Sequence, residues 1–139
     1  MREGAFAREF DFAVGDQHRF RLWTQKNGQA LMLLRRDKET LDLVAGLCRD
    51  GVMRWYDLGP PEGVADRGGL VIAGPGAGLR LEVELKGTGG SQRKGQKIFE
   101  GNMRRWRGIY VLVDPQDGVS GGVRAVNQAI DERVAAGVP

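Results

Sequence analysis

The sequence predicts an α/β fold in which helices flank one mixed β-sheet. In the second half, two apolar strand patterns (residues 80–86 and 108–113) enclose a helical segment (92–106). A strand–helix–strand unit of this kind pairs its strands in parallel. In the first half, Asn27-Gly28 is a strong hairpin signal and adds antiparallel strands. The two kinds of pairing together predict a mixed sheet.

The opening helix is predicted over residues 3–14, where Phe6 and Phe10 are spaced to form one apolar stripe. Residues 38–47 are ambiguous, because their apolar spacing fits a short helix and their alternation fits a strand. The strands predicted in this half are residues 18–23, 30–34 and 52–56.

The second half is more regular. Residues 69–73 form a short apolar strand, and a glycine-rich turn at 74–78 leads into the strand over 80–86. A closing helix is predicted over 119–136. No repeat or shift in composition divides the chain, so we expect a single domain over residues 1–139.

Histidine and cysteine are almost absent, which excludes several kinds of chemistry. The chain has one His and one Cys, too few for a zinc finger or a His-rich metal site, and a Ser-His-Asp triad or a Cys-His dyad would have to use these single residues. A lone cysteine fits a reducing, cytoplasmic setting, and no apolar run is long enough to span a membrane. Any bound metal is therefore expected to be a hard cation held by carboxylates, namely Mg²⁺ or Mn²⁺.

The net charge of +3 is mildly basic, and the positive charge is concentrated in one segment. Residues 93–107 contain six basic side chains and a single acid, Glu100. A basic cluster of this density can neutralise phosphates, although a solvated helix face is the more common explanation. The basic residues are Arg93, Lys94, Lys97, Arg104, Arg105 and Arg107.

The strand over 80–86 carries the candidate active site. Its alternation buries one apolar face and places Glu84 and Lys86 side by side on the other. Asp66 lies just before the preceding strand, so the two carboxylates are expected to converge at one end of the sheet. Such a pair can hold Mg²⁺, and the lysine can orient a water or stabilise developing charge. Taken alone, a Glu-x-Lys pair is more often an ion pair than a catalytic unit.

The order of these motifs resembles the VRR-NUC branch of the PD-(D/E)XK nuclease superfamily. The matching elements are Gly63-Val64-Ala65-Asp66, Glu84-Leu85-Lys86, Gly89-Gly90-Ser91 with Gln96, and Ile109-Tyr110-Val111-Leu112-Val113. The resemblance covers the last two thirds of the chain and implies a PD-(D/E)XK nuclease-like sandwich.

The resemblance also implies roles for individual residues. Asp66, Glu84 and the backbone carbonyl of Leu85 would bind Mg²⁺, and Gln96 would position Lys86 or the scissile phosphate. A helix glutamate would complete the metal site, with Glu3 preferred and Glu9 as the alternative. The expected contacts to DNA phosphates are Arg93, Lys94, Lys97, Arg104 and Arg105.

Stand-alone domains of this branch resemble phage enzymes and archaeal Holliday-junction resolvases. The expected function is therefore symmetric nicking of four-way DNA junctions by a homodimer in a bacterial or phage-infected cell. A flap or general repair endonuclease would share the same residues. A non-catalytic DNA-binding module, or an interaction protein with an ion-paired strand, are the remaining alternatives.

Overall fold

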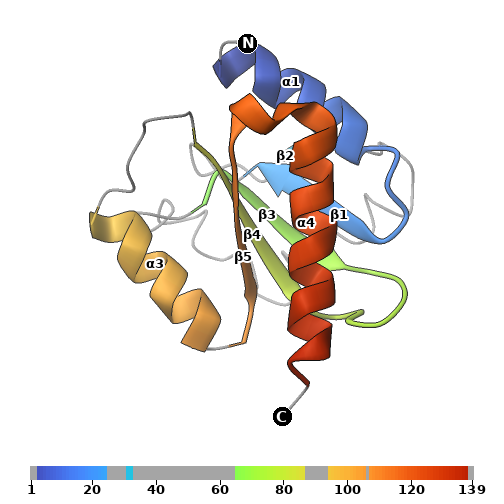
Figure 1. Cartoon of the computed structure of the whole chain (residues 1–139), viewed down its shortest axis with the longest axis vertical. Coiled ribbons are helices and arrows are strands. Elements are labelled where there is room, and N and C mark those ends of the chain that lie inside the picture. Colours follow the sequence, from blue (N-terminus) through green and yellow to red (C-terminus); the bar gives the residue numbers. More distant parts are fainter. Residues whose placement is uncertain (1–2, 25–30, 33–64, 87–93, 106, 138–139) are drawn as a thin grey trace.

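A computed structural model describes residues 3–24, 31–32, 65–86, 94–105 and 107–137. Within these ranges, the first helix is followed by four strands, a second helix, a fifth strand and a closing helix (Figure 1). The elements are α1 Glu3–Val14, β1 Phe20–Thr24, β2 Leu31–Met32, β3 Arg67–Val71, β4 Arg80–Leu85, α3 Lys94–Arg105, β5 Ile109–Val113, the 3-10 turn η3 Pro115–Asp117, and α4 Gly118–Ala135.

The five strands form one mixed sheet in the order β2-β1-β3-β4-β5. Neighbouring strands are antiparallel except for β4 and β5, which are parallel and connected through the segment that contains α3. Helices α1 and α4 pack together over one face of the sheet, and α3 lies apart from them beside β5 (Figure 1). This arrangement confirms the predicted α/β class with a mixed, helix-flanked sheet.

The hydrophobic core lies between the sheet and the α1–α4 pair. Phe6 and Phe10 are fully buried and stack with ring centroids 5.8 Å apart, as their helical spacing predicted. They pack with Val126 and Ile130 of α4 in the same buried cluster. The alternating apolar residues of β4 complete this face, and they are Leu81, Val83 and Leu85. Burial of this apolar surface is the main contribution to stability.

Strand β3 begins two residues earlier than the predicted strand at 69–73. It contains Gly68 and Gly69, which have low intrinsic preference for strands. Its position between β1 and β4 in the sheet order decides the conformation, because both edges of β3 are hydrogen-bonded to neighbours. The glycine at 69 is required by packing: a Cβ there would lie 2.5 Å from the carbonyl oxygen of Arg21.

Several predictions lie outside the described residues, namely the Asn27-Gly28 turn, the ambiguous segment 38–47 and the strand over 52–56. The antiparallel pairing of β1 with β2 agrees with a hairpin between them. None of the helices in the described ranges combines the length and apolar character needed to cross a lipid bilayer.

Candidate active site

Two buried carboxylates lie side by side where β3 begins and β4 ends. The register pairs Arg67 with Val83, so one further step places Asp66 opposite Glu84. Both belong to the face of the sheet that is turned away from the hydrophobic core, and their exposed fractions are only 5% and 4%. Opposed residues of antiparallel strands have Cβ atoms roughly 5 Å apart. The two acids therefore converge as the sequence predicted.

A backbone hydrogen bond fixes the direction of the Asp66 carboxylate. Its Oδ2 accepts from the backbone N–H of Leu85 at 3.0 Å, so the side chain reaches across to β4. The next backbone N–H, that of Lys86, donates to the carbonyl of Val113 at 2.9 Å and extends the ladder between β4 and β5. The end of β4 is thus hydrogen-bonded on both sides, to the Asp66 carboxylate and to β5.

Helix α3 contributes a buried amide to the same place. Gln96 lies in the first turn of α3, is 6% exposed, and its Nε2 donates to Oε1 of Glu84 over a long 3.4 Å. Lys86 directly follows β4 and is half-buried. Continued alternation puts its side chain on the face that carries Glu84. Four of the predicted catalytic residues are thereby brought to one end of the sheet.

A residue pair that the sequence did not reveal braces this site from the other face. Arg67 binds Asp11 of α1 in a two-pronged ion pair, with Nε and Nη2 each 3.0 Å from a carboxylate oxygen. Its Nη1 also donates to the backbone carbonyl of Asp66 at 3.1 Å. One guanidinium therefore connects the opening helix to the residue that carries the first carboxylate. The only available signal was a charge in an otherwise small and apolar strand.

A second unpredicted group lies next to Glu84 on β4. Glu82 is almost completely buried, at 1% exposed, and binds the guanidinium of Arg80 at 2.9 and 3.0 Å. The Arg80 guanidinium also lies 4.9 Å from the centre of the Trp23 ring. A stacked cation of this kind balances the buried charge of Glu82. Glu82 is thereby explained as part of an ion pair.

The third predicted metal ligand was a glutamate of α1, with Glu3 preferred and Glu9 as the alternative. Glu3 begins α1, but its side chain lies outside the described residues, and Glu9 is exposed. Within the described ranges, no group of three or more His, Cys, Asp or Glu side chains is placed to hold a metal ion. The donor set that is present, two adjacent carboxylates, fits Mg²⁺, which commonly takes one or two protein carboxylates and keeps several waters.

The predicted phosphate contacts divide between the two ends of α3. Lys94 and Lys97 are exposed in its first turns, near Gln96, whereas Arg104 and Arg105 are exposed in its last turn. Arg93 lies outside the described residues. The aromatic residue Tyr110 is buried beneath α3 in an edge contact with Phe99, as expected for a packing role.

No known protein family, curated protein or solved structure matches the chain. The family resemblance indicated by the sequence motifs therefore stays a prediction.

Proposed function

We propose that this protein is a divalent-metal-dependent endonuclease that cuts branched DNA, with Asp66 and Glu84 at its active centre. The observation that carries the proposal is the convergence of these two buried carboxylates on one face of the sheet, beside Gln96 and Lys86. One or two protein carboxylates, completed by waters, are the usual protein ligands of Mg²⁺. A fold that retains them at a strand end is typical of a site for chemistry.

Each side chain has a role that its position supports. Asp66 and Glu84 would hold Mg²⁺ together with the backbone carbonyl of Leu85, and Mn²⁺ would substitute. The cation would polarise the phosphoryl oxygen and lower the pKa of a bound water. Lys86 would orient the attacking water or stabilise negative charge on the phosphate as it is attacked.

Gln96 is a positioning residue in this proposal. Its amide donates to Oε1 of Glu84 and limits the orientations that the carboxylate can take. Because Gln96 lies in the first turn of α3, it also couples the acidic pair to the helix that carries Lys94 and Lys97. These exposed lysines would hold the DNA backbone on either side of the scissile phosphate.

The four-way junction as substrate, and a homodimer as the active form, rest on the resemblance to VRR-NUC domains and archaeal resolvases. Two identical sites related by a two-fold axis would match the symmetry of a junction and produce paired nicks. The PD-(D/E)XK fold is part of the same proposal, supported by the order of β3, β4, α3 and β5 around the acids.

The test is cleavage of a labelled four-way junction and of a linear duplex built from the same arms, with Mg²⁺ and with EDTA. We expect symmetric nicks in the junction only, lost with EDTA and reduced roughly 10³-fold or more by Glu84→Gln. Glu132→Gln, an exposed acid on α4, is the matched control and should cut normally.

Other outcomes would change the proposal in distinct ways. Equal cutting of junction and duplex would indicate a general or flap endonuclease that uses the same residues. Cleavage that survives Glu84→Gln would show that the reaction does not use this site. Tight junction binding without cleavage under any metal would indicate a DNA-binding module.

A further inference from the structure

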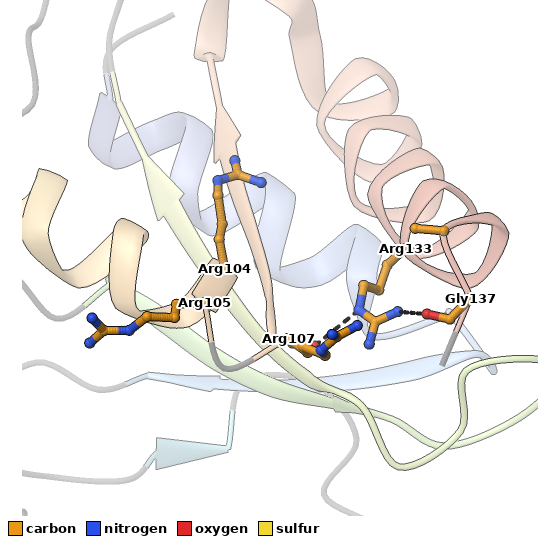
Figure 2. A pocket seen from close by; sticks show the side chains of 6 residues that line it. Arg104, Arg105, Arg107, Arg133 and Gly137 are labelled. Carbon is orange, nitrogen blue, oxygen red and sulfur yellow. Dashed lines mark hydrogen bonds between the residues drawn. The ribbon is translucent and has the colours of Figure 1, made fainter. Parts of the chain in front are cut away.

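A patch of four arginines lies at the far end of α3 from the acidic pair. Their side chains line an open depression of about 310 Å³ between the ends of α3 and α4 (Figure 2). The lining residues are Arg104, Arg105, Arg107, Arg133, Ala136 and Gly137. Four of the described residues that line the depression are therefore arginines, and none of these described residues is acidic.

Hydrogen bonds orient arginines of the patch. Arg133 donates to the backbone carbonyls of Arg107 at 3.1 Å and Gly137 at 2.6 Å, which orients its guanidinium without neutralising it (Figure 2). Arg104 forms an exposed ion pair with Glu100 at 2.7 Å. An exposed pair of this kind contributes little and is readily exchanged for another anion.

Helix dipoles explain only part of the arrangement. Arginines in the last turns of α3 and α4 are favoured there by the partial negative charge of a helix C-terminus. Arg107 lies outside both helices, with a φ of 66° that is uncommon for a residue other than glycine. This turn places a fourth guanidinium in the depression, where it increases repulsion among like charges unless an anion is bound.

An exposed stripe along α3 connects the patch with the candidate active site. Lys94, Lys97, Gly101 and Arg104 follow the spacing of one helix face, and all four are exposed. No atom approaches within 4 Å of the position that a Cβ on Gly101 would take, so the middle of the stripe is open. From Gln96 to the last turn of α3 the helix rises about 14 Å. That distance corresponds to roughly four base pairs of duplex.

We infer that the four-arginine patch is a second binding site for the phosphodiester backbone of DNA, about four base pairs from the scissile phosphate. The inference rests on the proposed function and extends it. The side chains of Arg104 and Arg105 leave the end of α3 in different directions (Figure 2). Divergent guanidiniums around an open depression suit successive phosphates of a polymer better than one small anion.

The test compares two double variants with equal charge loss, each in a Glu84→Gln background that prevents cleavage. Arg105→Gln with Arg107→Gln changes the patch, and Arg8→Gln with Arg124→Gln removes exposed arginines on the helices of the other face. Binding of a labelled junction is measured from 50 to 300 mM salt. Only the patch variant should bind roughly tenfold more weakly, with a salt slope less steep by about one per arginine.

A second arm locates the contact on the DNA. The Glu84→Gln protein should bind a junction with a neutral methylphosphonate linkage four base pairs from the cut more weakly than it binds the unmodified junction. The patch variant should bind the modified and the unmodified junction equally well. An unchanged salt slope, or equal effects of both double variants, would overturn the inference. If inorganic phosphate binds the patch but the patch variant binds DNA normally, the inference is overturned in favour of a single-anion site.

These outcomes are separable from failure of the proposed function. If the wild-type protein cuts no DNA but the patch variant still loses DNA affinity and salt dependence, the backbone-binding site stands and the nuclease proposal fails. If the wild-type protein cuts the junction and the patch variant does not raise the dissociation constant, the nuclease proposal stands and this inference fails.

Discussion

The two faces of the sheet both bury side chains, but of different chemistry. Under α1 and α4 the buried side chains of the sheet are apolar apart from Arg67, and Phe6 and Phe10 of α1 pack against them. On the opposite face the sheet buries Asp66, Glu82 and Glu84. Apolar burial stabilises a fold, whereas buried charge costs free energy unless it is compensated. The difference indicates that the apolar face contributes most of the stability, whereas the other face holds the acids that the proposed function uses.

The largest expected effect on stability comes from a substitution in the apolar face. Phe10→Ala should lower the free energy of unfolding by about 4 kcal/mol, because the fully buried ring leaves a cavity against Phe6 and α4. Glu84→Gln should change it by less than about 1 kcal/mol, since it removes repulsion between neighbouring acids and keeps an acceptor for Gln96. Urea denaturation of both variants measures the contrast. A loss at Glu84 as large as that at Phe10 would mean that the carboxylate is structural.

The ion pair between Arg67 and Asp11 should have the next largest effect. Asp11→Ala would leave the guanidinium mostly buried without its carboxylate, and we expect a loss of about 3 kcal/mol. Asp16→Ala is the control, because Asp16 is exposed just beyond the same helix, and it should change stability by less than about 0.5 kcal/mol. Similar denaturation midpoints for the two variants would contradict the assigned role of Arg67.

The smallest expected effects on stability concern two glycines, one on each side of the comparison between packed and open positions. Gly69→Ala in β3 would place a methyl against the Arg21 carbonyl and the Leu22 side chain, costing about 2 kcal/mol. Gly101→Ala on the open side of α3 meets no neighbour and should stabilise by about 0.5–1 kcal/mol through helix propensity. Thermal unfolding of the pair should shift the midpoint in opposite directions. A destabilising Gly101→Ala would show that the outer side of α3 is covered.

Local patterns were sufficient to predict much of the fold and the centre of the candidate site. The stripe of Phe6 and Phe10 defined α1, and alternation in β4 set which face carries Glu84. Placing Asp66 at the start of the neighbouring strand then led to the acidic pair. Each of these inferences depends on periodicity within one element or on the order of adjacent elements.

The remainder depended on contacts that no local pattern encodes. Arg67 and Asp11 are separated by 56 positions, so their pairing follows only from the packing of α1 on the sheet. The strand conformation of Gly68 and Gly69 opposes their intrinsic preference and comes from pairing on both sides. The position of Glu82 under Arg80 and Trp23 likewise needed the sheet order, because Trp23 belongs to a strand separated from β4 by β3.

The Arg67 guanidinium binds both Asp11 of α1 and the backbone carbonyl of Asp66. If α1 unfolds around Asp11, the position of Arg67 beside the Asp66 backbone is therefore no longer fixed from the helix side. If the proposed function holds, unfolding of this end of α1 should therefore also reduce cleavage. Attempts to raise its thermal tolerance at α1 would also tune the geometry of its acidic pair.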